Sequence, residues 1–175
     1  TNRGFVLEKF GRYEEVLKAY DKALKIDPNN TIARSNRDIA LKKLEQDAGS
    51  LKAFHAAIKA NPRDAKAYHE RAVVLEKLRR FEEALRAFDK AVEINPDDAV
   101  VHFHRGFILE KLGRHEEVLK AYDRSIGINP NDARVHNNRG LVLAKFGRDV
   151  EAMQAFDKAI QVDDRLQAGP TPRQI

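Results

Sequence analysis

The chain repeats itself with a period of 34 residues. A proline recurs at one phase of this period and an aromatic residue at another; they are Pro28, Pro62, Pro96 and Pro130, and Tyr20, Phe54, Phe88, Tyr122 and Phe156. A period of about 20 to 50 residues is typical of an array in which each small unit packs on its neighbours, without one central core. The repeat therefore restricts the fold class before any helix is assigned.

Each copy contains two stretches in which apolar residues follow the helical period of 3.6. In the fourth copy the first runs from Val101 to Leu112 and the second from Val118 to Ile126. Between them stands Gly113, which favours the left-handed turn that ends a helix. Each copy is therefore expected to be a helix, a tight turn and an antiparallel helix, which makes the fold all-α.

The residues that flank these stretches agree with two helices per copy. Asp98 precedes the first stretch, where its carboxylate can cap the free amides of a helix N-terminus. Asn129 and Pro130 follow the second stretch and are expected to end it. Two columns of small residues allow the backbones of paired helices to approach closely; they are Ala19, Ala53, Ala87, Ala121 and Ala155, and Gly4, Ala72, Gly106 and Gly140.

The pattern resembles the tetratricopeptide repeat family. The third copy carries the resemblance at Tyr68, Ala72, Leu75, Phe81, Ala84, Phe88, Ala91 and Pro96, and the fourth at His102, Gly106, Leu109, His115, Val118, Tyr122, Ser125 and Pro130. The resemblance implies a right-handed α-solenoid of about four and a half to five helix-turn-helix units. We expect one array over 1–166, with copies at 1–30 (truncated at its start), 31–64 (degenerate), 65–98, 99–132 and 133–166, and a tail at 167–175 without a capping helix.

The second copy departs from the pattern at several places. Asp38 replaces the small residue, Glu45 the turn glycine and Asp47 an aromatic residue, and Gly49 stands near the start of the second helix. A carboxylate at a close helix crossing must stay hydrated, and a glycine inside a helix costs about 1 kcal/mol relative to alanine. The simplest interpretation is a weak repeat held by its neighbours, and the alternative is a functional hinge. Asp164, in place of the fifth proline, is a further departure.

Composition excludes several classes of site. The chain has no cysteine, so it has neither disulfides nor cysteine-ligated zinc. Its net charge is +5, but 32 basic and 27 acidic residues alternate closely, which argues against a nucleic-acid partner. No apolar run approaches the ~20 residues that a membrane span needs. The compartment is left open, with the cytoplasm favoured, because the chain starts at Thr1 within a repeat and the native N-terminus is expected to be missing.

An arginine recurs in every copy and an aspartate in all but the second. The arginines are Arg3, Arg37, Arg71, Arg105 and Arg139, and the aspartates are Asp21, Asp89, Asp123 and Asp157. The arginines are either a comb for an acidic ligand or members of structural ion pairs between helices. We favour the ion pairs, because recurring, partly buried arginines are normally paired.

The resemblance implies that the first helices of successive copies line a concave groove that binds a partner. The residues expected to line it are Asn36 in the second copy, Lys66, His69, Glu70, Val73 and Lys77 in the third, Phe103, His104, Phe107 and Lys111 in the fourth, and Arg134, Asn138, Leu141 and Lys145 in the fifth. An apolar column with lysines beside it suits an amphipathic helix or extended segment that carries acidic residues. The alternatives are contacts between adjacent helices for the apolar column, and a solvated rim for the lysines.

The sequence offers no catalytic constellation. His69–Glu70 and His115–Glu116 begin a zinc-protease motif, but Val73 and Leu119 stand where the second histidine is required. A cluster of His69, Glu70 and His104 across the groove remains a minor possibility for a metal site. No cofactor is expected, and we expect the chain not to be an enzyme by itself.

The predicted function is a protein-protein interaction scaffold that binds a peptide or helix of a partner protein. The alternatives are the arm of a longer enzyme, such as a glycosyltransferase, and a self-assembling structural layer. Solenoids need capped ends, and the tail at 167–175 offers no polar capping helix. We therefore also expect self-association through the ends of the array.

Overall fold

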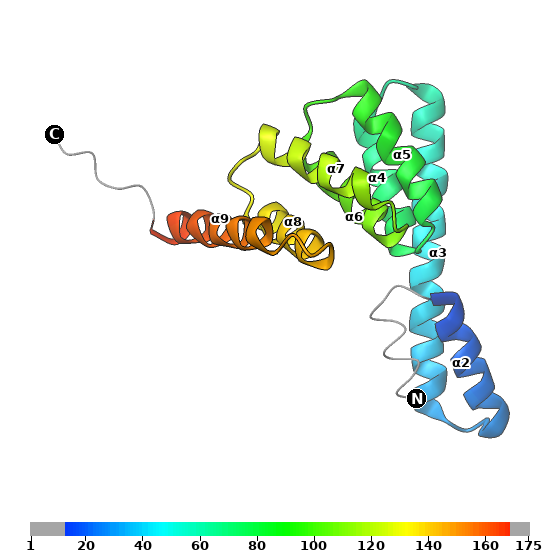
Figure 1. Ribbon diagram of the computed structural model, residues 1–175. Coiled ribbons are helices and arrows are strands. Elements are labelled where there is room, and N and C mark those ends of the chain that lie inside the picture. The colour runs from blue at the N-terminus through cyan, green and yellow to red at the C-terminus, as the bar shows by residue number, and fades with distance from the viewer. Residues whose placement is uncertain (1–12, 169–175) are drawn as a thin grey trace. The chain divides into compact units, whose positions relative to one another are not determined.

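The computed structural model describes residues 13–168, within which every regular element is an α-helix (Figure 1). The helices are α2 (Tyr13–Ile26), α3 (Thr31–Ala60), α4 (Ala65–Lys77), α5 (Phe81–Ile94), α6 (Ala99–Lys111), α7 (His115–Ile128), α8 (Ala133–Lys145) and α9 (Asp149–Ala168). The predicted all-α fold is confirmed. In this part of the chain no helix is long and apolar enough to cross a bilayer. The chain divides into two compact units, Thr1–Ile94 and Asn95–Ile175, called the first and second unit below.

Aspartate N-caps fix the start of the first helix in the third, fourth and fifth copies. Asp98 Oδ1 accepts hydrogen bonds from the backbone N–H groups of Val100 and Val101, at 3.0 and 3.2 Å. Asp64 and Asp132 cap α4 and α8 in the same way. The caps satisfy backbone donors that a helix N-terminus otherwise leaves without a partner, so the sequence sets where each of these copies begins.

The turn between the two helices contains one residue with positive φ. Gly113 has φ 71° and Gly147 has φ 68°, which confirms the left-handed turn predicted from the glycine. Arg79 adopts φ 58° at the same position of the third copy. Because a side chain is tolerated there, the replacement of this glycine by Glu45 does not by itself prevent a turn in the second copy.

In the third, fourth and fifth copies, an arginine and a glutamate three residues later form an ion pair at the start of the second helix. The pairs are Arg80–Glu83, Arg114–Glu117 and Arg148–Glu151, each joined by two hydrogen bonds of 2.6 to 2.8 Å. The arginine lowers the pKa of the Glu83 and Glu151 carboxyls, chiefly through these hydrogen bonds. The second copy has Gln46 and Gly49 at the two positions, so it lacks this pair.

The two helices of a hairpin meet where a small residue faces an aromatic ring. A Cβ atom added to Gly106 would lie 2.6 Å from the ring of Tyr122, and one added to Gly140 would lie 2.6 Å from the ring of Phe156. In the third copy Ala72 is fully buried, as is Phe88. These distances leave no room for a larger side chain. They confirm the close helix approach that the column of small residues predicted.

The second copy does not form the predicted hairpin. Its residues make one continuous helix, α3, which runs through the position of the turn. Asp38 occupies the small-residue position, and 66% of its side chain is exposed. Ala53 is exposed as well, although its counterparts Ala87 and Ala121 are buried. A hairpin would press the Asp38 carboxylate against an aromatic ring without water, and the continuous helix avoids that cost.

The long helix α3 packs on different neighbours at its two ends within the first unit. Near its start, α2 lies alongside it (Figure 1), and Val16 and Tyr20 share a buried cluster with Ala33 and Ala40. Helix α4 also packs on α3, and α4 and α5 form a hairpin. The predicted hairpin of the second copy is thus wrong, since α3 is an uninterrupted helix, whereas the alternative of a functional hinge stays a prediction.

In the second unit the hairpins α6–α7 and α8–α9 are consecutive copies. Helix α7 ends at Ile128, which corresponds to Val162 of the next copy, whereas α9 continues to Ala168. Asp164 explains the difference, because the other copies have a proline at this position and proline disfavours helix in the residue before it. That the five copies form one array stays a prediction. Arg3 of the arginine column and Gly4 of the small-residue column lie outside the described residues, as do residues 169–175 of the predicted tail.

Replacing either of two glycines by alanine tests the close helix approach. We expect Gly106→Ala to lower the free energy of unfolding by about 1–3 kcal/mol, because the new methyl group overpacks against Tyr122. We expect Gly127→Ala in α7 to raise it by up to about 1 kcal/mol, because nothing lies within 4 Å of its added Cβ and alanine favours helix. Urea denaturation measures both; equal effects of the two substitutions would contradict the packing.

Candidate protein-binding surface

Helices α6 and α8 lie side by side in the second unit. The Arg134 guanidinium lies 5.5 Å from the centre of the Phe103 ring, near the start of both helices. Lys145 forms an ion pair with Glu110, near the end of both. The two helices are therefore parallel, with residues about one repeat apart facing each other. The candidate residues of these helices, together with the exposed Val100, form the α6–α8 surface: Val100, Phe103, His104, Phe107, Lys111, Arg134, Asn138, Leu141 and Lys145.

Apolar side chains make up much of this surface. Val100 is 46% exposed and Leu141 is 49% exposed. Phe103 is partly buried, because its ring packs 6.1 Å from that of Tyr122 on α7 and 5.4 Å from that of His104. The repeat places Leu141 beside Phe107, since the two occupy the same position of successive copies. The surface thus offers aromatic and aliphatic contact area that its own hairpins leave accessible.

The basic residues of the surface are mostly engaged by neighbours. Arg134 donates to Asp132 at 2.7 Å, and this hydrogen bond lowers the pKa of the Asp132 carboxyl. Lys145 is paired with Glu110, as described above, whereas Lys111 lies 4.5 Å above the centre of the Phe107 ring. Within the described residues Lys111 is the basic member without a carboxylate partner. The lysine column is therefore less free for an acidic ligand than the sequence suggests.

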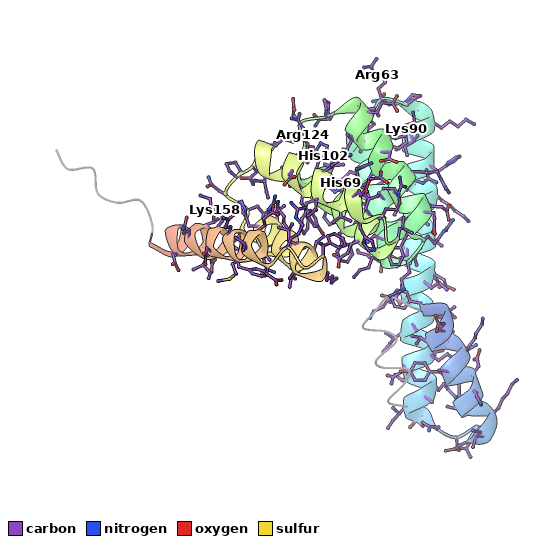
Figure 2. All side chains as sticks on the ribbon, in the orientation of Figure 1. Arg63, His69, Lys90, His102, Arg124 and Lys158 are labelled. Carbon is purple, nitrogen blue, oxygen red and sulfur yellow. The ribbon has the colours of Figure 1, made fainter. Side chains whose placement is uncertain are left out.

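The remaining predicted residues belong to the first unit. His69, labelled in Figure 2, lies on α4, and its ring centre is 6.0 Å from that of Phe88 on α5. Glu70 and Val73 are half-buried, and Lys66 and Lys77 are exposed. Asn36 is half-buried on α3, outside any hairpin. That these residues extend the same groove as the α6–α8 surface stays a prediction.

Two buried histidines have a structural role that the sequence did not indicate. His102 Nε2 hydrogen bonds to the carbonyl oxygen of Pro96 at 2.9 Å, and His136 Nε2 to that of Pro130 at 3.0 Å. Arg34 donates to Pro28 in the same way, at 2.6 Å. In all three contacts the side chain belongs to the sixth residue after the proline, and this spacing is the signal that the sequence contains. In the described part of the chain no three His, Cys, Asp or Glu side chains are placed to hold a metal ion.

Ion pairs between successive copies account for part of the arginine column. Arg37 donates to Asp21 at 2.6 Å, and Arg139 donates to Asp123 at 2.7 Å. In both pairs the aspartate is on a second helix and the arginine is sixteen residues later, on the next first helix. The predicted structural ion pairs are confirmed at these two positions. Asp21 raises the pKa of the Arg37 guanidinium, first by its hydrogen bond and then by its charge.

The second unit has a cleft that the sequence did not predict. It measures about 520 Å³, between α7 and the turn that joins α8 to α9. Leu119 and Phe146 supply its apolar lining, and Lys120 and Asp123 are among its charged lining residues. Its mixed charges favour no particular ligand.

Family models of the tetratricopeptide repeat match residues 1–30, 65–98, 87–120 and 133–165. The chain belongs to the tetratricopeptide repeat family. The matched segments leave out 31–64, where the continuous helix α3 replaces a hairpin. A comparison with curated proteins found no match.

Solved structures of two proteins are similar over most of the chain. A crystal structure of MamA is 22% identical with a TM-score of 0.69, and covers 94% of this chain and 96% of its own. MamA from Desulfovibrio magneticus RS-1 is 19% identical with a TM-score of 0.65, and covers 97% and 94%. YrrB, described as a TPR protein with an unusual peptide-binding site, is 26% identical with a TM-score of 0.63, and covers 95% and 88%. The family and these folds support a protein-interaction scaffold.

A double-mutant cycle on Asp123 and Arg139 tests the pairing between copies. We expect Asp123→Asn and Arg139→Gln to be coupled by a few tenths to about 1 kcal/mol in the free energy of unfolding, as partly exposed ion pairs are. The aspartate in the same copy as Arg139 is Asp157, whereas Arg139 pairs with Asp123 of the copy before, so a cycle on Arg139 and Asp157 should show no coupling. Coupling at the second pair and none at the first would show that the pairs form within copies instead.

Proposed function

We propose that the protein binds a short segment of a partner protein on the α6–α8 surface. The observation that carries this proposal is the row of accessible apolar side chains along two parallel helices, from Val100 to Leu141, which the Arg134–Phe103 and Lys145–Glu110 contacts hold in register. A helix or extended segment that places apolar residues along such a row buries them without reorganising the hairpins. Preformed surfaces of this kind lose little entropy on binding.

The ligand that fits this surface is mainly apolar and has an acidic residue at one end. Lys111 stands at the end of α6, beside the Phe107 ring, and its ammonium is available to a carboxylate. Arg134 and Lys145 already have carboxylate partners on their own surface. Additional acidic residues in the ligand therefore add less binding free energy than the lysine column alone suggests, because each further carboxylate competes with an existing ion pair.

The similarity to YrrB supports a peptide as the ligand. That protein is described as having a peptide-binding site, and it is 26% identical to this chain. We propose that Lys66, Glu70, Val73 and Lys77 on α4, and Asn36 on α3, provide further contacts to the same partner. His69 contributes less in this account, because its ring packs toward Phe88.

Selection of peptides from a random display library tests the surface directly. Peptides enriched on the wild-type chain are expected to contain apolar residues with an acidic neighbour. Their dissociation constants, measured by fluorescence anisotropy, should rise about tenfold or more with Phe107→Ala and with Lys111→Glu, a change of ~1.4 kcal/mol or more.

Lys120→Glu is the matched control, because Lys120 is an exposed lysine on α7, away from this surface. Circular dichroism and urea denaturation establish that each variant retains its fold. Peptides that bind the Phe107→Ala and Lys111→Glu variants as tightly as the wild type would place the binding site elsewhere.

A further inference from the structure

The hairpin of α4 and α5 in the first unit has a cleft of about 410 Å³, called the α4–α5 cleft below. Its lining includes Arg71 on α4 and the buried Ala87 on α5. Lys90, labelled in Figure 2, is also one of the lining residues. Among the described residues none of α3 lines the cleft, although α3 contains the copy that precedes this hairpin.

In the second unit the corresponding surface binds the second helix of the preceding copy. Arg139 and Ala155 stand two repeats after the arginine and the alanine of the α4–α5 cleft. Asp123 of α7 accepts a hydrogen bond from Arg139 at 2.7 Å. Leu119 of α7 packs against the buried cluster that contains Ala155. The α4–α5 cleft is therefore open at a position where this fold binds a helix elsewhere.

Two arginines of the α4–α5 cleft form no ion pair with any residue that the structure describes. Arg71 is partly buried on α4, and Arg86 is exposed on α5. Sixteen residues before Arg71 stands His55, where the paired arginines Arg37 and Arg139 have an aspartate. Helix α3 therefore lacks the carboxylate that a preceding copy supplies to these other two arginines. Because a partly desolvated guanidinium is stabilised by a carboxylate beside it, an acidic residue from outside fits this position.

The carboxylates that line the α4–α5 cleft are already engaged. Glu83 is joined to Arg80 by two hydrogen bonds of 2.6 and 2.8 Å. Glu93 accepts a hydrogen bond from Lys90 at 2.6 Å, and Asp89 is not free either. The charge that a ligand meets in the cleft is therefore chiefly that of the two arginines, which is complementary to a carboxylate.

The helices that cover an equivalent position share a leucine and an aspartate four residues apart. In α7 these are Leu119 and Asp123, and in α2 they are Leu17 and Asp21. Asp21 accepts a hydrogen bond from Arg37 of α3 at 2.6 Å, and Leu17 packs on the buried cluster between α2 and α3. Residues four apart lie on one face of a helix, so the pair contacts the neighbouring copy as a unit.

We propose that the α4–α5 cleft binds a helix of a partner protein that carries a leucine and an aspartate four residues apart. In this contact the aspartate pairs with Arg71, and the leucine packs over Ala87. A second copy of this chain does not supply such a helix, because its pairs in α2 and α7 are engaged and Leu85, which precedes Asp89, is 4% exposed. The cleft belongs to the first unit and is separate from the α6–α8 surface, so this inference does not rest on the function proposed above.

A fluorescent peptide with the sequence of α7, His115–Ile128, tests the proposal, because it contains the leucine-aspartate pair. Fluorescence anisotropy should show saturable binding to the wild-type chain. Arg71→Gln should raise the dissociation constant about three- to tenfold, since it removes the cation that the aspartate meets. The same peptide with Asp123→Asn should bind the wild-type chain more weakly by a similar factor, and the Arg71→Gln chain should no longer distinguish the two peptides. Dependence on Arg71 separates this binding from exchange of the peptide with α7 itself.

Arg63→Gln is the matched control, because Arg63 (Figure 2) is an exposed arginine of the first unit outside the cleft and should leave the dissociation constant unchanged. Circular dichroism shows whether each variant keeps its helices. The proposal is overturned if the peptide does not bind at its highest soluble concentration, or if Arg71→Gln binds it as tightly as the wild type. Sedimentation velocity that shows self-association of the wild-type chain, lost in Arg71→Gln, would place a second copy in the cleft and equally overturn it.

Discussion

The hairpins of this chain depend on a close contact between a small residue and an aromatic ring. Gly106 and Gly140 leave only enough space for the Tyr122 and Phe156 rings, because an added Cβ would lie 2.6 Å away. Where the contact forms, two antiparallel helices bury their shared face, and the turn between them needs only one residue with positive φ. Where Asp38 replaces the small residue, the same approach would desolvate a carboxylate, and the chain continues as one helix.

The hairpin contact also determines the surface that is available to a partner. In the second unit it aligns α6 and α8 side by side, so that residues one repeat apart become neighbours. Many of the charged residues that recur in the sequence are then used between or within copies, as Arg139 with Asp123 and Lys145 with Glu110. What the α6–α8 surface offers for recognition is chiefly apolar, and among its described residues Lys111 is the cation without a carboxylate partner. Specificity for a partner therefore depends more on the positions of its apolar side chains than on its overall charge.

The sequence predicts the local structure of the regular copies well. Asp98 and Gly113 have unambiguous roles, because capping and a left-handed turn depend on one residue and its nearest neighbours. The arginine-aspartate pairing was predictable in kind. Its partner was not, because the sequence gives an arginine such as Arg139 one aspartate in its own copy, Asp157, and another in the copy before it, Asp123. The pair of Lys145 with Glu110 depends on how two helices align, and no local pattern indicates it.

The second copy shows how several tolerable departures combine. Arg79 takes the turn conformation without glycine, and Asp149 stands in α9 where other copies have an aromatic residue or histidine, so neither Glu45 nor Asp47 alone prevents a hairpin. The second copy adds Asp38 at the helix crossing and lacks the arginine-glutamate pair at the start of its second helix. The sequence revealed each departure. Their combined free-energy cost decides between a hairpin and a continuous helix, and this cost depends on packing across the hairpin, which the sequence does not show.

The distance between spin labels at Ile32 and Lys59, both exposed on α3, tests this account most directly. The chain has no cysteine, so two introduced cysteines are its only labelling sites. A continuous helix separates these positions by about 40 Å, at 1.5 Å per residue. The corresponding pair in the third copy, Lys66 and Glu93, should give a short distance, since packed helices lie about 10 Å apart. A long distance in the second copy and a short one in the third is the predicted result; short distances in both would show that Asp38 does not prevent the hairpin.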